Sequence, residues 1–186
     1  MKEQETEIKL LVRDPARLKS RLRSLGATLA RRRHFEDNFV FDLPDRRLRR
    51  KGSLLRVRLT DGKATLTFKG PSRIVARTKS RMELETDVVD GSKTRRILEL
   101  LGLRCQFRYQ KFRTVYQKGN ALITVDETPM GIYFEIEGSP RSIRTIARHL
   151  GFQEGDFITA TYVDLFRKYR RANRIQSRNM MFGIRA

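Results

Sequence analysis

The sequence predicts an α+β fold in which about eight antiparallel strands close into a barrel and helices pack on its outside. Three observations lead to this prediction. Two glutamates one residue apart occur in strand-like segments at residues 5–7, 83–85 and 135–137. Each of these segments is followed by a helical pattern that ends in Leu-Gly. The segments between them alternate charged and apolar side chains, which is typical of strands with one charged and one apolar face.

The composition indicates one basic, soluble-type domain. The 186 residues suffice for a domain with its own core. Lys and Arg number 41 against 21 Asp and Glu, a net charge of +20, so an anionic partner such as nucleic acid, an acidic membrane surface or a polyphosphate is expected. The single cysteine cannot form an internal disulfide, no apolar run reaches the ~20 residues of a membrane span, and no signal-type apolar core begins the sequence. We therefore expect a cytoplasmic protein without a membrane segment.

The first half of the chain reads as a strand, a helix and three further strands. Residues 4–12 form the first strand, and Asp14-Pro15 then supplies a helix cap and a first-turn proline. Leucines at helical spacing continue to Gly26, which ends the helix. Strands follow at 37–42, 54–59 and 64–69, and an Asp-Gly hairpin turn joins the last two.

The second half repeats this outline. A strand at 81–89 leads to a helix that Ser92 can cap and Gly102 ends. Strands at 107–117 and 121–127 precede the strand with the third pair of glutamates, and Ser139-Pro140 opens another helix. A last helix is predicted at 159–171.

The charged residues of each strand share one face, because successive side chains of a strand point to opposite sides. An open sheet would expose that face to water, whereas a closed barrel would enclose it and leave no free edge. Because burying uncompensated charge costs many kcal/mol, the inside of such a barrel would be a wet channel filled with ions. The charged faces carry Glu5, Glu7, Lys9, Arg56, Arg58, Lys69, Arg81, Glu83, Glu85, Lys111, Arg113, Glu135 and Glu137.

Six motifs of this set occur in a characteristic order. They are Glu5-x-Glu7-x-Lys9, Arg56-x-Arg58, Lys69, Lys111-x-Arg113, Asp126 and Glu135-x-Glu137. Over residues 3–169 the chain thereby resembles the CYTH superfamily of triphosphate tunnel metalloenzymes, which contains class IV adenylate cyclases, thiamine triphosphatases and inorganic triphosphatases. Segments 37–42 and 123–138 resemble the class IV adenylate cyclase branch most.

The resemblance implies an eight-stranded antiparallel tunnel with helices outside. We place this CYTH triphosphate tunnel domain at residues 1–171 and a basic C-terminal tail at 172–186. The tail has no clear period, so we expect it to be poorly ordered or to pack on a neighbour.

The charges suit a triphosphate bound with a metal. A triphosphate carries about four negative charges, and arginine can contact phosphate oxygens with two N–H groups at once. Carboxylates would repel it unless a hard divalent cation stood between, and oxygen ligands without clustered His or Cys favour Mg²⁺ or Mn²⁺. The residues suited to the triphosphate are Lys9, Arg56, Arg58, Lys69, Lys111 and Arg113, of which Lys9, Lys111 and Arg113 are the catalytic candidates.

The resemblance also points to metal ligands. It implies that Glu7, Glu135 and Glu137 bind the metal, with Glu5 and Asp126 beside it or holding a second ion. Glu83 and Glu85 could ligate metal as well, or could instead neutralise interior arginines. The alternative reading of all these residues is a set of solvated strand faces joined by cross-strand salt bridges.

Two reactions fit one such site. In a cyclase the ribose 3′-hydroxyl of ATP attacks the α-phosphorus and pyrophosphate leaves; in a hydrolase water attacks the terminal phosphorus of inorganic, thiamine or nucleoside triphosphate. The resemblance favours the cyclase.

Other roles stay open beside these reactions. A nucleic-acid-binding module would explain the net charge and the basic runs at 46–51 and 167–174, but not the glutamate pairs. We expect those runs and 31–33 to form a surface that collects polyanions, apart from the tunnel. A homodimer stays open, and His34 is expected at the surface or at a strand end.

Overall fold

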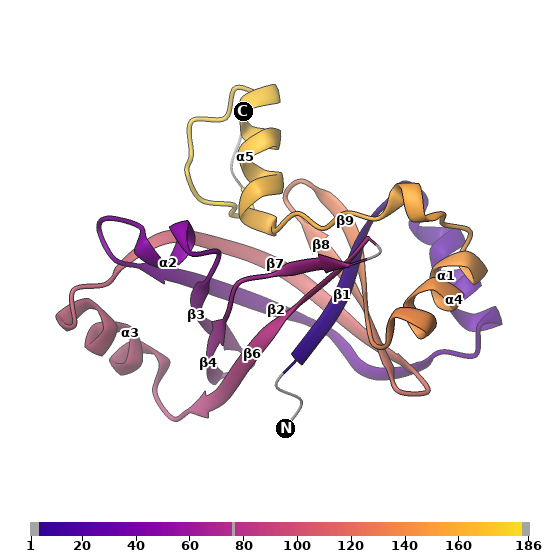
Figure 1. Cartoon of the computed structure of the whole chain (residues 1–186), viewed down its shortest axis with the longest axis horizontal. Coiled ribbons are helices and arrows are strands. Elements are labelled where there is room, and N and C mark those ends of the chain that lie inside the picture. The colour runs from indigo at the N-terminus through magenta and orange to yellow at the C-terminus, as the bar shows by residue number, and fades with distance from the viewer. Residues whose placement is uncertain (1–3, 76, 184–186) are drawn as a thin grey trace.

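The computed structural model describes residues 4–75 and 77–183 (Figure 1). The strands are β1 (Gln4–Val12), β2 (Thr28–Asp42), β3 (Leu54–Thr60), β4 (Lys63–Lys69), β5 (Arg73–Val75), β6 (Thr78–Val88), β7 (Arg104–Lys118), β8 (Ala121–Thr128) and β9 (Gly131–Glu137). The α-helices are α1 (Pro15–Ser24), α2 (Arg47–Arg50), α3 (Gly91–Leu100), α4 (Pro140–His149) and α5 (Tyr162–Ala172), and a 3-10 turn covers Glu154–Asp156.

Eight of the strands form a closed antiparallel barrel, as the sequence predicts. Their order is β1-β9-β8-β7-β2-β3-β4-β6, and β6 pairs with β1 to complete the ring. The closing ladder sets Glu7 opposite Lys79 and Glu5 opposite Arg81. The short β5 pairs with β6 beside this closing ladder and is not a member of the ring. Closure leaves the wall without a free edge, and the inward face of every strand then borders a common interior.

The largest apolar cluster lies outside this wall. Ile8 and Leu10 of β1 stand opposite Ile136 and Phe134 of β9, and all four are fully buried. They pack against apolar residues of α1 and α4, such as Leu22. Since side chains alternate along a strand, the outward burial of these residues turns the intervening glutamates and Lys9 toward the inside.

Two smaller clusters hold α3 and α5 against the other side of the barrel. Phe41 and Val57 pack with Leu98 of α3. Phe107 of β7 packs with Phe166 of α5. In Figure 1, α5 stands above the barrel with its N-terminal end nearest the strands, where Tyr162 and Phe166 pack on Phe107 and Tyr109.

Three strands begin several residues earlier than the sequence predicts, among them β7, which begins at Arg104 instead of residue 107. β2 begins at Thr28 instead of residue 37 because it pairs with β7 from Thr28 to Asp42. The basic run 31–33 is therefore part of β2, where Arg31 pairs with Asp61 at 2.8 Å and Arg33 with Glu127 at 2.8 Å. β6 begins at Thr78 instead of residue 81, and its added residues close the barrel.

The helix caps agree with the sequence except at α3. The Asp14 and Ser139 side chains accept hydrogen bonds from backbone N–H groups of the first turns of α1 and α4. In α3 the cap is Asp90 and not Ser92, because the Asp90 carboxylate accepts both the Ser92 and Lys93 N–H groups at 2.9 Å. A carboxylate two residues earlier thus satisfies two orphan donors that the Ser92 hydroxyl would leave open.

The tail was expected to be poorly ordered or to pack on a neighbour, because its sequence has no clear period. As far as residue 183 it packs on β7 of its own chain. Met180 is fully buried, its N–H donates to the Arg108 carbonyl at 3.0 Å, and its carbonyl accepts the Gln110 N–H at 2.8 Å. Buried Ile175 adds a second apolar anchor. Residues 184–186 lie outside the described residues.

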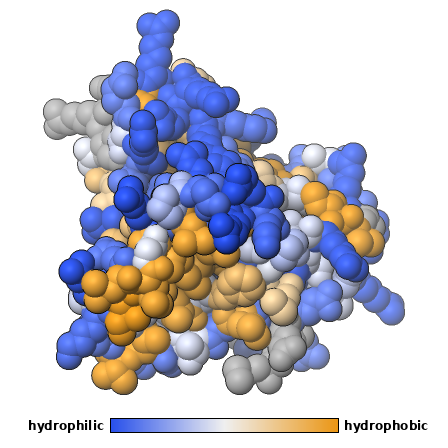
Figure 2. Space-filling model, turned by 60° about the vertical axis from the view of Figure 1, so that its left-hand side comes forward, coloured by the Kyte–Doolittle hydropathy of each residue, from blue (hydrophilic) through white to orange (hydrophobic). Residues whose placement is uncertain are grey.

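The surface separates apolar from charged regions. Around α3, apolar side chains such as Val89, Leu100 and Leu101 are exposed, and Figure 2 shows an apolar patch on this face with hydrophilic side chains above it. Within residues 4–75 and 77–183, none of the helices combines the length and the apolar character needed to cross a bilayer.

Candidate active site in the tunnel

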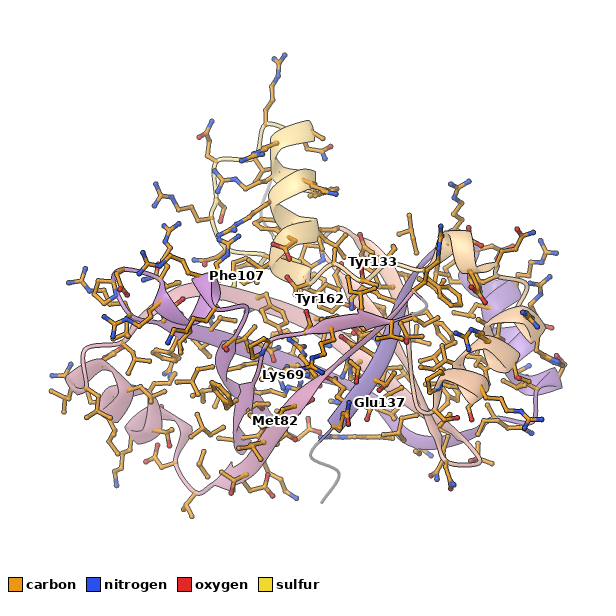
Figure 3. The ribbon with its side chains drawn as sticks, viewed as in Figure 1. Lys69, Met82, Phe107, Tyr133, Glu137 and Tyr162 are labelled. Atoms are coloured by element: carbon orange, nitrogen blue, oxygen red, sulfur yellow. The ribbon has the colours of Figure 1, made fainter. Side chains whose placement is uncertain are left out.

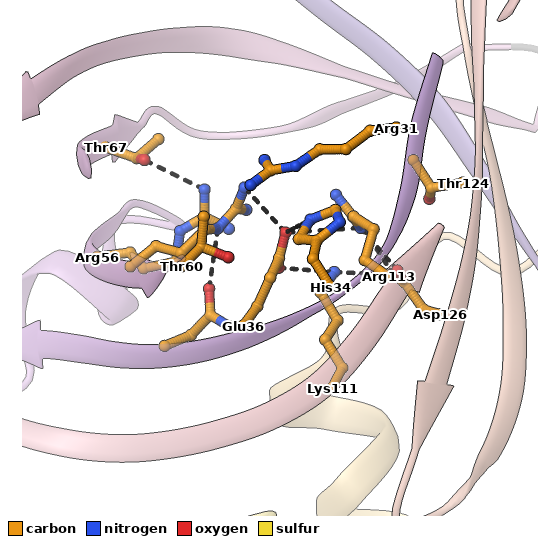
Figure 4. Close-up of polar contacts among 12 residues, drawn as sticks. Arg31, His34, Glu36, Arg56, Thr60, Thr67, Lys111, Arg113, Thr124 and Asp126 are labelled. Atoms are coloured by element: carbon orange, nitrogen blue, oxygen red, sulfur yellow. Dashed lines mark hydrogen bonds and ion pairs between the residues drawn. The ribbon is translucent and has the colours of Figure 1, made fainter. Parts of the chain in front are cut away.

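The deepest part of the tunnel is an ion-pair network centred on Asp126 (Figure 4). Strand register places Arg113 of β7 directly opposite Asp126 of β8. The Asp126 carboxylate accepts hydrogen bonds from Arg113 Nε at 2.6 Å, from Lys111 Nζ at 2.8 Å and from the Tyr162 hydroxyl at 2.8 Å. Asp126 is fully buried, so this carboxylate is held by three donors and has no contact with water.

Glu36 of β2 forms the opposite side of this network. Its Oε1 lies 3.4 Å from Arg58 Nη1 and 3.6 Å from His34 Nε2, and its Oε2 lies 3.5 Å from Lys111 Nζ. Burial would raise the pKa of Glu36, but Lys111, Arg113 and Arg58 outweigh burial and hold that pKa well below its ordinary value. Glu36 is therefore an anion that several cations share.

Glu135 of β9 links the network to β1. Its Oε1 lies 2.6 Å from Lys9 Nζ, and Arg113 Nη2 donates to its Oε2 at 2.5 Å. Burial would raise the pKa of Glu135, but the charges of Lys9 and Arg113 keep that pKa well below its ordinary value. The same pairing raises the pKa of Lys9 despite its burial.

Arg56 and Arg58 of β3 form the wall facing Lys9. Both side chains lie on the inner face; Arg56 is buried and the Arg58 side chain is 16% exposed. Arg56 Nη2 donates to Thr67 Oγ1 at 3.1 Å and lies 3.4 Å from Glu85, whose side chain is half exposed. Burial and the charge of Arg56 lower the pKa of the Arg58 guanidinium. Among the described residues, Arg58 has one acidic partner, Glu36, and its Nε donates to Asn38 Oδ1 at 3.1 Å.

Four glutamates lie near Lys69, where β6 and β9 both pair with β1; Figure 3 labels Lys69 and Glu137 of this group. Lys69 Nζ lies 2.9 Å from Glu5 and 2.8 Å from Glu83. Glu7 and Glu137 stand directly opposite each other in the β1–β9 ladder. Burial, together with the charges of Glu5, Glu83 and Glu7, raises the pKa of Glu137 to about 7. We call Glu5, Glu7, Glu83 and Glu137 the carboxylate cluster.

The carboxylate cluster fits a hard divalent cation by its chemistry. Its donors are all carboxylate oxygens, and their mutual repulsion is what a bound Mg²⁺ or Mn²⁺ would relieve. In the part of the chain that the structure describes, no three Asp, Glu, His or Cys residues already converge in a metal-binding arrangement. Glu5 and Glu7 are instead paired with Lys69, Arg81 and Lys79. Metal binding here would require these side chains to turn away from their cations.

The space among these side chains is small. The cavity measures about 80 Å³, room for only a few waters at about 30 Å³ each. Its lining holds eight Lys and Arg residues against three Glu. The eight cations are Lys9, Arg56, Arg58, Lys69, Lys79, Arg81, Lys111 and Arg113, and the three acids are Glu5, Glu7 and Glu135. A larger anion could enter only by displacing carboxylates from the cations that they now contact.

The structure divides the predicted site residues into groups. All six predicted triphosphate ligands line the cavity. The five predicted metal ligands do not converge: Asp126 and Glu135 are tied to Lys and Arg in the deep network, whereas Glu5, Glu7 and Glu137 belong to the carboxylate cluster. Glu83 joins that cluster, and Glu85 contacts Arg56 and Thr67, as expected of a residue that neutralises an interior arginine.

Several interior residues were not predicted. Lys79 was missed because the strand was expected to begin at residue 81. His34, expected at the surface or a strand end, is buried in β2, and it lies inside because β2 extends back to Thr28 and alternate residues 34, 36 and 38 face the tunnel. Alternation of polar residues at these three positions was a signal for this. Nothing in the sequence signals Tyr162, since α5 brings it to Asp126 from 36 residues away.

The fold and this lining define a class of protein, namely a closed antiparallel β-tunnel whose interior carries many cations paired with carboxylates. The CYTH domain family profile matches residues 3–162. The chain belongs to the CYTH family.

Named relatives agree with this assignment. A Methanocaldococcus jannaschii protein provisionally named adenylate cyclase is 28% identical over 172 residues, which cover 87% of this chain and 97% of that protein. A Vibrio parahaemolyticus structure provisionally named adenylate cyclase superposes with a TM-score of 0.80 at 18% identity and covers 90% of this chain and 99% of its own. A Hippeastrum structure, described as an adenylyl cyclase with dominant triphosphatase activity, gives a TM-score of 0.67 at 20% identity and covers 89% of this chain and 96% of its own.

Proposed function

We propose that this protein is a divalent-metal-dependent enzyme that binds the triphosphate group of its substrate inside the tunnel. The observation that carries the proposal is the convergence of eight Lys and Arg side chains on one cavity whose lining holds three glutamates. Four further carboxylates contact these cations from outside the lining, those of Glu36, Glu83, Glu85 and Asp126, so seven carboxylates hold the eight cations together. Cations packed this closely repel one another, and an anionic ligand would take over the role of these carboxylates.

The roles follow from the walls of the tunnel. Arg56 and Arg58 offer two N–H groups each to phosphate oxygens from β3. Lys9, Lys111 and Arg113 face them and would hold the reacting phosphorus and stabilise the charge that develops on its oxygens. Lys69 lies between the phosphate-binding wall and the carboxylate cluster.

The metal would be held by the carboxylate cluster. Glu5, Glu7 and Glu137 supply oxygen ligands, with Glu83 beside them, and the ion would offset the repulsion between carboxylates and phosphates. We propose that Asp126 and Glu135 contribute less to metal binding, because both are already paired with cations in the deep network. Their main role would be to orient Lys111, Arg113 and Lys9.

Cyclisation of ATP to cyclic AMP and pyrophosphate is the reaction we propose first. The Methanocaldococcus relative, which matches over nearly its whole length, is provisionally named for this activity. The test is to incubate the purified protein with ATP and Mg²⁺ or Mn²⁺ and to separate the nucleotide products. Cyclic AMP with equimolar pyrophosphate is expected; ADP with phosphate would replace cyclisation by hydrolysis, and intact ATP alongside intact tripolyphosphate and thiamine triphosphate would refute the tunnel as a triphosphate site.

Hydrolysis of a triphosphate is the second candidate, and one observation favours it. The carboxamide of Asn38, which faces the tunnel, already accepts a hydrogen bond from Arg58 Nε at 3.1 Å, and the two tyrosines of the lining, Tyr109 and Tyr162, are buried. Such a lining recognises phosphate and offers little to a nucleobase. A role as a nucleic-acid-binding module alone would leave the buried network without a purpose.

A further inference from the structure

A groove of about 770 Å³ lies between α2 and α5, beside one mouth of the tunnel. Its floor is formed by residues of β2, β3 and β7 such as Val40 and Phe107. Six arginines from two distant parts of the sequence stand around it: Arg46, Arg49, Arg167, Arg170, Arg171 and Arg178. α2 and α5 are linked across the groove by Arg49 and Asp164, which lie 3.7 Å apart.

The groove has few anions of its own. Asp42 and Asp164 line it. The Asp42 carboxylate is occupied by the backbone N–H groups of Leu48 at 2.9 Å and Arg49 at 3.0 Å. Asp164 accepts the Thr161 hydroxyl at 2.7 Å and lies 3.7 Å from Arg49.

The remaining arginines are therefore available to a ligand. Within residues 4–75 and 77–183, the other five groove arginines form no ion pair with Asp or Glu. By contrast, Arg31 and Arg33 of the basic run in β2 are paired with Asp61 and Glu127. The groove arginines are thus largely unpaired, whereas Arg31 and Arg33 on β2 are neutralised by neighbouring acids.

The groove adjoins the tunnel. Leu54, Arg81, Thr161 and Val163 line both cavities. Arg81 also contacts Glu5 at 3.2 Å, so a path of cations runs from the groove arginines to the carboxylate cluster. An anion bound in the groove could therefore extend into the tunnel and remain in contact with Lys or Arg side chains along its whole length.

The chemistry of the groove favours a dense, flexible anion over a nucleic acid strand. Single-stranded nucleic acids are held by basic grooves together with aromatic rings on which bases stack. The aromatic residues here, Phe41 and Phe107, are 1% and 6% exposed and form the floor, so they offer no stacking face. A ligand with a charge on every repeating unit and no bases would use all six arginines.

We propose that the groove binds a long inorganic polyphosphate chain whose end enters the tunnel. This goes beyond the proposed function, and rests on it only for the end that occupies the triphosphate site. The proposal replaces the expectation that the basic surface is separate from the tunnel, because the runs at 46–51 and 167–178 meet at its mouth.

The test compares two ligands and two matched pairs of substitutions in the full chain. Arg171→Glu with Arg178→Glu alters two exposed groove arginines, and Arg17→Glu with Arg148→Glu alters two exposed arginines on α1 and α4. Both pairs change the net charge equally. Affinities for long-chain polyphosphate and for inorganic triphosphate are measured by calorimetry in the presence of a chelator, so that neither metal nor turnover is needed, and thermal unfolding confirms that each variant is folded.

The groove pair should lose about tenfold in affinity for long-chain polyphosphate, equivalent to about 1.4 kcal/mol, and more than the control pair loses. The salt dependence of polyphosphate binding should become shallower by about one unit of slope per arginine. Polyphosphate should also displace triphosphate from the wild-type protein.

Equal losses of polyphosphate affinity in the two pairs would refute the groove as the binding site. An equal loss of affinity for a single-stranded RNA homopolymer in the groove pair would make the groove a nucleic acid site. Loss of triphosphate binding in Arg56→Ala without loss of polyphosphate binding would retain the groove and refute only the shared end.

Discussion

At the scale of a single residue, Glu36 shows how an internal carboxylate pairs with the tunnel cations while no anionic ligand is bound. It is 1% exposed, and Arg58, Lys111 and Arg113 all lie within 4 Å of its carboxylate. Buried cations repel one another strongly, so an internal carboxylate must stand among them while no ligand is bound. The internal acids therefore stabilise the fold and are also what a triphosphate must displace.

Replacing Glu36 by Gln should unfold the protein more easily. Removing one charge from a buried ionic group typically costs about 3–5 kcal/mol, because its partners stay buried and unpaired. Urea denaturation should show this loss in low-phosphate buffer. Added tripolyphosphate should recover more stability in Glu36→Gln than in the wild type, since the ligand supplies the missing anion. Unchanged stability, or equal recovery in both proteins, would contradict this reading.

The Glu137→Gln variant should make the metal-free protein less sensitive to pH. Burial and the neighbouring glutamates raise the pKa of Glu137 in the folded protein to about 7, so the folded state binds this proton more tightly than the unfolded state. The stability this provides is complete below the ordinary glutamate pKa and is lost as the pH rises through about 7. The wild type should therefore be less stable at pH 8 than at pH 5.5, and the variant less affected.

Thermal unfolding in a chelator at both pH values measures this difference. Mg²⁺ should raise the unfolding temperature of the wild type at pH 8 and should have a smaller effect on Glu137→Gln, which offers one charged ligand fewer. A wild type whose stability is flat between the two pH values would show that Glu137 does not repel its neighbours.

At the scale of an element, α5 and the segment after it complete the site although they follow the last barrel strand. Tyr162 at the start of α5 donates to Asp126, and Thr161 and Val163 line the tunnel mouth. The segment 173–183 then returns to β7 and buries Met180 against Phe107 and Tyr109. The tail thus helps to hold α5 beside the tunnel mouth, so its deletion cannot be read as a loss of surface charge alone.

Met180→Ala should destabilise the protein by about 2–5 kcal/mol, as is usual when a fully buried large side chain is cut back to alanine. The neighbouring Met181 is only half buried, and Met181→Ala provides a matched control with a smaller expected loss. Denaturation curves for the two variants measure the difference. Equal small effects would mean that the tail does not anchor α5.

At the scale of the whole molecule, ligand binding and folding share one set of charges. The eight cations of the lining come from five different strands of the closed ring, so an anion that contacts them would link those strands to one another. A ligand that binds only the folded state stabilises it by mass action, about 2.7 kcal/mol at a concentration of one hundred times its Kd. Stability is thus a readout of the tunnel that needs no turnover.

Tripolyphosphate with Mg²⁺ should accordingly raise the unfolding temperature, and Arg56→Ala and Arg58→Ala should each reduce that rise. Removing a cation that contacts phosphate weakens ligand binding, while the circular dichroism of the variants should stay close to that of the wild type. Arg148→Ala on α4, away from the tunnel, serves as the control. A rise that is the same in all four proteins would place the ligand outside the tunnel.

The sequence by itself determined the alternation of charge along the strands, and with it the closed barrel and the inner positions of Lys9, Arg56 and Lys111. Alternation is a local property, and a strand has only two faces. Because residues such as Ile8 are buried on the outer face, the charged side chains that alternate with them must point into the tunnel. Helix caps and ends are local for the same reason, and they were predicted at α1 and α4.

Only the tertiary structure decided which charges meet. The backward extension of β2, which brings Glu36 and His34 inside, depends on pairing with β7, and the contact between Tyr162 and Asp126 depends on where α5 packs. The separation of the predicted metal ligands into two groups, and the meeting of α2 with α5 at the tunnel mouth, join residues far apart in the chain. Such contacts are set by long-range packing and ion pairing in three dimensions, and no local period of the sequence encodes them.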